Sequence, residues 1–260
     1  MSGEPEDKED KLAEGTLISH LLELRTRLVK AFAAVFIVWI PCAVESNRLF
    51  EFVAHPIMKM LPPNAHLIAT GVMSPFMTPF KLSMYVALFI AMPYVLYQLW
   101  AFVAPGLYRR EKRFAIPLLA SSIVLFYCGM AFVYYAVFPV MFKFFARTTP
   151  AGVTWNADIS SYLNFVMKMF FAFGLAYEAP VAVVLLVMTG LVKLEWLKHN
   201  RGYVLILVFV ISAAVTPPDS ISMTIMAVPM YLLYEAGLFF AGMFDKMKRR
   251  EEAQQQAKAQ

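Results

Sequence analysis

Two long runs without charge constrain this chain more than any other feature. Leu82–Tyr108 and Phe114–Phe142 contain no Asp, Glu, Lys or Arg. Each run exceeds the roughly 20 apolar residues that an α-helix needs to cross the hydrocarbon core of a membrane. Charged residues make up 16% of the whole chain, well below the roughly 25% typical of soluble domains. The sequence therefore predicts an integral membrane protein built from helices.

Four further apolar segments complete the predicted set of spans. The first is preceded by a helical stretch from near Leu21, the fourth and sixth contain isolated charges, and the fifth is short. These segments are Ala31–Val44, Ile159–Val192, Gly202–Pro218 and Ser220–Phe244. We expect an all-α bundle of six transmembrane helices in which the fifth and sixth form a short, shallow hairpin.

Polar segments flank the predicted spans. The acidic opening "MSGEPEDKEDKLAEG" lacks the apolar core of a signal peptide, so we interpret residues 1–15 as a disordered cytosolic tail. The closing "KMKRREEAQQQAKAQ" predicts a basic, polar cytosolic tail over residues 245–260. Residues 16–244 then form the membrane domain.

The distribution of Lys and Arg predicts the topology. Cations concentrate in both terminal flanks and in the loops between spans two and three and between spans four and five. The other loops hold only Arg48, Lys59, Lys81, Lys143 and Arg147. Because cationic loops stay in the cytoplasm, we expect both termini inside. The net charge of +5 is then a topology signal, and we expect no nucleic-acid partner.

Motifs for catalysis or cofactor binding are missing from the sequence. It contains no G-x-x-x-x-G-K-[ST], no H-E-x-x-H and no G-x-S-x-G. The four histidines are too dispersed for a local zinc motif, although His55 and His66 share one outward loop. Cys42 and Cys128 lie in apolar runs, where we expect them to be small core residues. We expect no enzyme activity, no cofactor and no metal.

Glu178 is the acid that is hardest to explain. It lies near the middle of the fourth span, where a charge costs about 2.5–3.5 kcal/mol on insertion scales. Lys168 is a poor partner, because ten residues of helix separate the two by about 15 Å with a rotation of some 80°. Glu178 therefore needs a partner on another helix, a hydrated groove, or a proton. A functional role and a purely structural hydrogen bond both remain open.

Three other acids have structural interpretations. Glu23 and Arg27 stand four residues apart, a favourable helical pair, in a segment whose leucine stripe predicts an interfacial helix. Glu235 lies toward the cytoplasmic end of the sixth span, where snorkelling or an interhelical bond would satisfy it. Asp219 follows "TPP" and is a candidate N-cap for the sixth span. The stripe consists of Leu17, Leu21, Leu24 and Leu28.

Several long segments together resemble one known family, the TatC proteins. The matching segments include "SHLLELRTRL", "SPFMTPFKLS", "YQLWAFVAPGLYRREKR", "SYLNFVMKMFFAFGLAYEAPV" and "TPPDSISMTIMAVPMYLLYEAGLFF". TatC is the multi-span core subunit of the twin-arginine protein translocase. The resemblance implies a concave, glove-like bundle in a bacterial cytoplasmic (inner) membrane, with N-in and C-in topology. It also implies export of folded proteins, driven by the proton-motive force.

The resemblance implies partners and site residues. The partners are twin-arginine signal peptides, TatB- and TatA-like single-span proteins, other TatC protomers and membrane lipid. Glu23, Arg25, Phe102 and Glu111 match positions linked to signal-peptide binding.

Further matches concern the groove, the outward loop and partner docking. Pro56 matches a proline of the first outward loop, and Glu178 matches the acid that faces the groove. Thr216 and Asp219 match the hairpin where the partner helix docks. Lys168 and Met223 depart from the family pattern. We expect a small or apolar side chain at the position of Lys168 and a polar side chain at the position of Met223.

Glu111 lies in an unusual loop, "GLYRREKRF". Arg109, Arg110, Lys112 and Arg113 surround it and are explained by topology alone. A solvated carboxylate neutralised by these neighbours is the simplest interpretation, since exposed pairs contribute at most about 1 kcal/mol. The resemblance instead implies that Glu111 binds a signal arginine, which requires the four cations to point away from the guest.

Two other function classes remain as alternatives. A secondary transporter or channel would use Lys168 and Glu178 as a substrate or proton path, although the sequence shows no internal repeat. A structural assembly scaffold would need neither cytoplasmic acid for export.

Overall fold

The computed structural model describes the chain outside residues 1–5, 59–66, 104–114, 149–155, 217–218 and 260. Helices dominate the described residues. The elements are α1 (Glu6–Val44), α2 (Ser46–Met58), β1 (Leu67–Ile68), α3 (Ser74–Val103), α4 (Ala115–Phe132), the π-helical η3 (Val133–Val137), α5 (Phe138–Thr148), β2 (Ala157–Asp158), α6 (Ile159–Ala176), α7 (Ala179–Met188), α8 (Leu194–His199), α9 (Arg201–Val215) and α10 (Ser220–Ala259).

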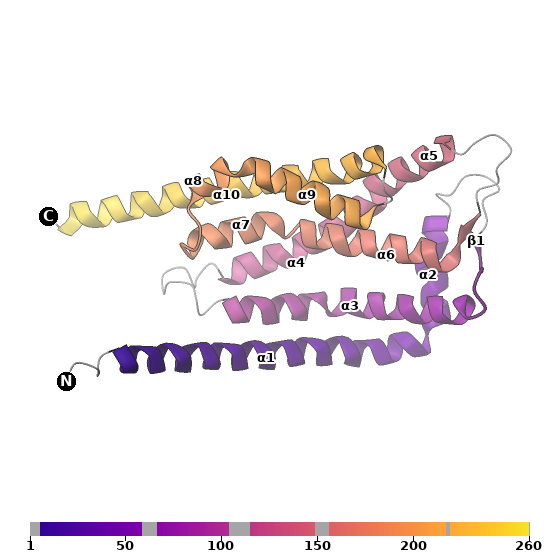
Figure 1. Cartoon of the computed structure of the whole chain (residues 1–260), viewed down its shortest axis with the longest axis horizontal. Helices are drawn as coiled ribbons and strands as arrows, with labels where there is room; N and C mark the ends of the chain where they lie inside the picture. The colour runs from indigo at the N-terminus through magenta and orange to yellow at the C-terminus, as the bar shows by residue number, and fades with distance from the viewer. Residues whose placement is uncertain (1–5, 59–66, 104–114, 149–155, 217–218, 260) are drawn as a thin grey trace.

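The long helices run along one common axis (Figure 1). Five helical stretches are long and apolar enough to cross a membrane, and Arg201–Val215 is a shorter apolar helix. The five are Leu21–Val44, Ser74–Val103, Ile116–Phe145, Ile159–Met188 and Ser220–Met247. The all-α membrane class is therefore confirmed. The beginning of α1 and the end of α10 lie at the same end of the bundle, at the left of Figure 1. The side of the membrane on which that end lies stays a prediction.

The structure differs from two sequence-based expectations about the outer segments. The predicted interfacial helix is wrong as a separate element, because residues 17–28 continue directly into the first span as part of α1. The loop after the first span contains the short helix α2. Helical structure begins at Glu6 and ends at Ala259, inside the two predicted tails. The division of the chain at residues 16 and 244 stays a prediction.

The cysteines also differ from expectation. Cys42 is buried, as predicted, but Cys128 is exposed on α4 and both are free thiols. An apolar run in a membrane protein serves lipid-facing and core-facing positions alike, so membership of the run did not determine burial.

Helix α1 packs chiefly against α3. The Trp39 Nε1–H donates to Ser83 Oγ at 3.2 Å, and the Trp39 ring meets Phe80 edge-on with centroids 5.2 Å apart. The Ser83 hydroxyl in turn donates to the Phe80 carbonyl at 2.7 Å. This contact holds the C-terminal half of α1 to the bundle. The remaining faces of α1 are mostly exposed, as expected of a peripheral lipid-facing helix.

The core lies where α3, α4 and α6 meet. Phe126 on α4 and Phe173 on α6 are fully buried, and Phe89 of α3 packs against Phe126. Gly129 lets α4 approach α6 closely, because a Cβ at this position would lie only 2.6 Å from the Phe173 carbonyl oxygen. A second close approach joins α7 and α10, where a Cβ on Gly237 would lie 2.8 Å from Pro180 Cα.

A short parallel bridge joins the segment between α2 and α3 to the segment between α5 and α6. Leu67 pairs with Ala157, and Ile68 pairs with Asp158. The Asp158 carboxylate accepts from the backbone N–H of Ser161 at 3.0 Å, from the Thr70 hydroxyl at 2.8 Å and from the Thr70 N–H at 3.2 Å. These bonds lower the pKa of Asp158 to about 2, and the bond from the Ser161 N–H has the largest effect. The bridge therefore gains stability from ionised Asp158 above pH about 4 and loses it as the pH falls toward 2.

Two glycine-to-alanine substitutions test the α4–α6 approach. Gly129→Ala places a methyl group against the backbone of α6, and overpacking of this kind costs about 1–3 kcal/mol. Gly202→Ala makes the same chemical change where no atom lies within 4 Å, and alanine favours a helix over glycine. We expect Gly129→Ala to lower the melting temperature of the purified protein by several degrees and Gly202→Ala to leave it unchanged or raised. Equal melting temperatures for the two variants would contradict the close approach.

Candidate functional site

Glu178 lies at a break in the fourth membrane stretch. Helix α6 ends at Ala176, Tyr177 and Glu178 form a turn, and α7 starts at Ala179. Pro180 accounts for the break, because it has no N–H to donate to the Ala176 carbonyl and its ring crowds that carbonyl. The turn directs the Glu178 side chain toward α4.

Two helices and the α6–α7 turn contribute to the hydrogen-bond network around Glu178. The Trp100 Nε1–H of α3 donates to Ser122 Oγ of α4 at 3.3 Å, and the Ser122 hydroxyl donates to Glu178 Oε2. Trp100 and Ser122 are both buried. The partner that the sequence demanded for Glu178 is therefore a neutral hydroxyl on another helix. We call these three residues the Trp100–Ser122–Glu178 network.

The spacing of α4 explains why Ser122 faces Glu178. Ser122, Phe126, Gly129 and Val133 follow one another at intervals of four, three and four, which places them on one face of a helix. Ser122, Phe126 and Val133 are almost completely buried. The close approach at Gly129 brings this face against α6, so the Ser122 hydroxyl reaches the turn at Glu178.

The second oxygen of Glu178 has no donor. Glu178 Oε1 is buried and accepts no hydrogen bond from the residues that the structure describes. A buried acceptor without a donor costs about 1–3 kcal/mol. Lys168 does not supply the missing bond: it is exposed on α6 and forms no ion pair within the described ranges. Glu178 is thus half satisfied, and one oxygen remains for a proton or for a donor from a bound molecule.

Glu23 forms the helical pair that its spacing predicts. Arg27 Nε and Nη2 both donate to Glu23 Oε1, at 2.9 and 2.7 Å. Glu23 Oε2 accepts nothing within the described part of the chain. The side chain of Glu23 is 34% exposed, so this second oxygen is open to a further cation.

The other residues of the predicted signal site are only partly brought together. Arg25 is exposed on α1, two residues after Glu23 and on a different face of the helix. Phe102 lies partly buried in the last turn of α3. Glu111 lies outside the described residues, together with the four cations beside it. The arrangement of Glu23, Phe102 and Glu111 as one site therefore stays a prediction.

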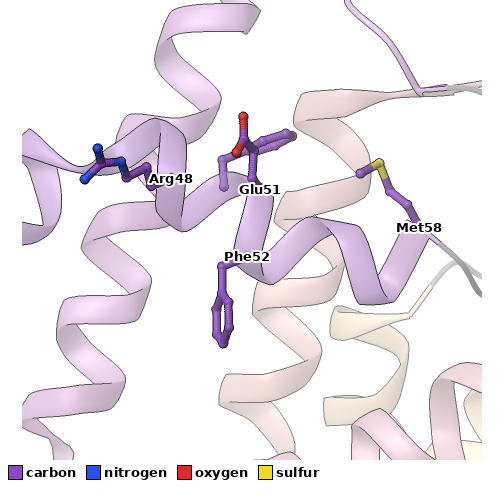
Figure 2. Close-up of a pocket in the computed structure, with 5 residues that line it drawn as sticks. Arg48, Glu51, Phe52 and Met58 are labelled. Carbon is purple, nitrogen blue, oxygen red and sulfur yellow. The ribbon is translucent and has the colours of Figure 1, made fainter.

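Pro56 belongs to α2, at the opposite end of the bundle. Its side chain is outside the described part of the chain, but the helix around it borders a cavity of about 510 Å³. Figure 2 shows Glu51 and Phe52 pointing to opposite sides of α2. Arg48 lies on the rim and pairs with Glu45 at 3.0 Å. This exposed pair leaves Glu51 without an ion pair among the described residues.

The hairpin between α9 and α10 carries Thr216 and Asp219. Asp219 caps α10, since its Oδ2 accepts from the Ser222 N–H at 2.9 Å, and the predicted N-cap is confirmed. Thr216 is buried, and its hydroxyl donates to the Ser212 carbonyl at 2.8 Å. Asp219 Oδ1 and Ser222 Oγ are buried without a partner among the described residues. Met223 is half-buried beside them.

Glu235 forms the interhelical bond that the sequence favoured. Its Oε2 accepts from Arg201 Nη2 of α9 at 3.0 Å, and its Oε1 accepts from the Tyr231 hydroxyl at 2.9 Å. The described residues contain no group of three or more His, Cys, Asp or Glu side chains able to hold a metal ion.

Comparison with known proteins gives one consistent family. The family model described as Sec-independent protein translocase protein (TatC) matches residues 19–229. A TatC protein from Azotobacter chroococcum mcd 1 is 48% identical over 252 residues, covering 97% of this chain and 96% of the relative. The Escherichia coli K12 TatC protein is 48% identical over 237 residues, covering 91% and 92%. A crystal structure of the twin-arginine translocase receptor TatC superposes with a TM-score of 0.78 at 37% identity, covering 86% of this chain and 98% of that one.

Removing the Ser122 hydroxyl tests the network. Ser122→Ala leaves both Glu178 oxygens without a donor and deprives the Trp100 N–H of its acceptor, which costs about 1–3 kcal/mol. Ser121→Ala is the matched control, because the Ser121 hydroxyl donates only to the Leu118 carbonyl of its own helix. We expect Ser122→Ala to lower the melting temperature clearly more than Ser121→Ala. If both variants melt alike, the network contributes nothing to stability.

Proposed function

We propose that this chain, which belongs to the TatC family of Sec-independent protein translocase proteins, is the receptor for twin-arginine signal peptides. Its family membership makes it a multi-pass membrane subunit of a protein translocase and not an enzyme. The proposal adds what this subunit binds and with which residues. Folded precursors would be exported across the cytoplasmic (inner) membrane with TatA- and TatB-like partners and other TatC protomers, driven by the proton-motive force. Both termini would face the cytoplasm.

The half-occupied carboxylate of Glu23 carries the proposal. Arg27 engages only Oε1, and a carboxylate accepts up to about four hydrogen bonds. An incoming guanidinium can therefore bind Oε2 without displacing Arg27. Arg27 also orients the Glu23 carboxylate. A guanidinium is preferred over an ammonium at such a site because it is planar and binds through two parallel donors.

The second arginine of the signal requires a second carboxylate. We assign this role to Glu111, which follows α3 in the sequence. Phe102 lies in the last turn of that helix. Phe102 would pack against the signal beside the arginines, and Arg25 would complete the charge pattern next to Glu23. Two carboxylates from different segments of the chain would then bind two consecutive arginines. A single exposed ion pair with one arginine would bind the signal only weakly.

Glu178 would act after this recognition step. Its Oε1 is buried inside the bundle, at the break between α6 and α7. We propose that a donor from the inserted signal or from a partner helix completes the hydrogen bonding of Glu178. Pro56 would serve the outward end of the same groove.

The α9–α10 hairpin would dock the partner helix. The hydroxyl of Thr216 is used inside α9, so we propose that the hairpin acts through its shape and through Asp219 Oδ1 and Ser222 Oγ. These two atoms have no partner among the described residues and offer hydrogen bonds to a polar group on the partner.

A double substitution tests the receptor role. We expect Glu23→Gln combined with Glu111→Gln to abolish site-specific crosslinking of a twin-arginine signal peptide, because both carboxylates lose their charge. The matched control is Glu45→Gln combined with Glu51→Gln, which removes the same charge at the opposite end of the bundle. This control should crosslink like the unmodified protein.

Two results would contradict the assignment of the site. One is undiminished crosslinking in the Glu23 and Glu111 double variant. The other is an equal loss in the Glu45 and Glu51 control, which would indicate a general charge effect. A signal with two lysines in place of the arginines should crosslink at least about tenfold less, a difference of about 1.4 kcal/mol.

A further inference from the structure

A second cavity, which Glu178 does not line, lies between α8, α9 and α10. Its volume is about 480 Å³, and both charged and apolar side chains line it. The charged ones are Lys198, Arg201, Glu235 and Lys246, and the others are Leu238, Phe239, Gly242 and Met243. None of these residues belongs to the proposed signal site, to the Trp100–Ser122–Glu178 network or to the docking hairpin.

The cavity has an excess of positive charge. Glu235 is the one acid among the described residues that line it, and Arg201 and the Tyr231 hydroxyl satisfy both carboxylate oxygens. Lys198 and Lys246 are exposed and form no ion pair with the described residues. Two ammonium groups are thus available for a ligand of negative charge. Arg201 Nη2 is used by Glu235, which fixes the guanidinium at the wall of the cavity.

The spacing on α10 explains why the cavity exists. Glu235, Phe239, Gly242 and Lys246 follow at intervals of four, three and four, so they line one face of the helix. Gly242 leaves this face without a side chain at its centre. A Cβ there would lie 3.6 Å from Leu194 Cδ2, which is an ordinary contact. The packing of α8 against α10 therefore does not require a glycine at this position, but the glycine leaves space in the cavity.

The surroundings place the cavity at the boundary between lipid and water. Trp196 on α8 is 59% exposed, and Tyr203 in the first turn of α9 is 74% exposed. Exposed Trp and Tyr concentrate at the headgroup level of membrane proteins. Lys198 and Arg201 lie between these two aromatics in the sequence, at the end of the bundle that also holds the start of α1 (Figure 1).

The apolar lining continues toward the hydrocarbon. Phe239 is 71% exposed and Met243 is 48% exposed, and both belong to the stretch Ser220–Met247 that is apolar enough to span a membrane. A ligand that places an anionic group between the lysines therefore has an apolar surface beside it for acyl chains. A free phosphate would use only the charged part of this cavity.

We propose that this cavity binds the headgroup of an anionic phospholipid, with Lys198 and Lys246 contacting the phosphate and Phe239 and Met243 contacting an acyl chain. Basic pockets between membrane helices on the cytoplasmic side have this chemistry. The bound lipid would hold α8 and the beginning of α9 against α10. The site is independent of signal recognition and would persist if the receptor role proved wrong.

Lipid titration of the full chain in a neutral detergent tests the proposal. Native mass spectrometry would measure the Kd of the first bound dioleoylphosphatidylglycerol, with dioleoylphosphatidylcholine as the neutral lipid and inorganic phosphate as the free anion. We expect the anionic lipid to bind about tenfold more tightly than the neutral lipid, and phosphate alone to bind much more weakly than either. Lys198→Gln combined with Lys246→Gln should weaken binding of the anionic lipid about tenfold or more, since each cation near a headgroup contributes appreciably.

Two further variants distinguish binding in the cavity from a general attraction of the anionic lipid to positive charge. Lys30→Gln combined with Lys193→Gln removes two exposed lysines outside the cavity and should change the Kd less than twofold. Gly242→Leu keeps every charge but fills the centre of the cavity, and it should weaken anionic lipid binding severalfold.

Three outcomes would overturn the proposal. They are equal binding of the two lipids, an equal loss in the Lys30 and Lys193 control, and full-strength binding of phosphate without acyl chains. Each variant is compared at unchanged helical content by circular dichroism, so a folding defect is recognised as such.

Discussion

The burial of one carboxylate organises the centre of this protein. A charge near the middle of a membrane costs about 2.5–3.5 kcal/mol on insertion scales, so Glu178 requires hydrogen bonding from neighbouring helices. Ser122 supplies one bond and is itself supported by Trp100, which links α3, α4 and the α6–α7 turn. Pro180 creates the turn, and Gly129 allows the approach of α4. The same network leaves Glu178 Oε1 without a hydrogen-bond donor among the described residues. A donor from a bound partner could supply this missing hydrogen bond.

Helix length is the second constraint. Helix α9 has 15 residues and spans about 22 Å at 1.5 Å per residue, short of the roughly 30 Å hydrocarbon core. A short helix is accommodated by local thinning of the bilayer. We infer that such thinning would surround the α9–α10 hairpin, in which Asp219 caps α10. A translocase gains from such a region, because a folded protein crosses less hydrocarbon there.

The features that could be predicted from the sequence are those set by residue spacing within one segment of the chain. The apolar helices, the Glu23–Arg27 pair and the Asp219 cap are all local features and are confirmed. The sequence predicted that Glu178 needs a partner but not which one. Ser121 and Ser122 are equivalent in sequence, and only the rotation of α4 makes Ser122 the donor to Glu178. The Leu67–Ala157 bridge and the exposure of Cys128 likewise depend on how distant segments meet. Glu111 lies outside the described residues, so its role rests on the resemblance to the family.

We propose that the carboxyl group of Glu178 serves a step after signal recognition. The measurement that tests this role compares signal crosslinking and precursor export for Glu178→Gln, since glutamine retains an oxygen that accepts from Ser122 but replaces the free Oε1 acceptor with an amide. We expect crosslinking close to that of the unmodified protein together with export reduced about tenfold or more. Unchanged export, or loss of signal crosslinking, would contradict it.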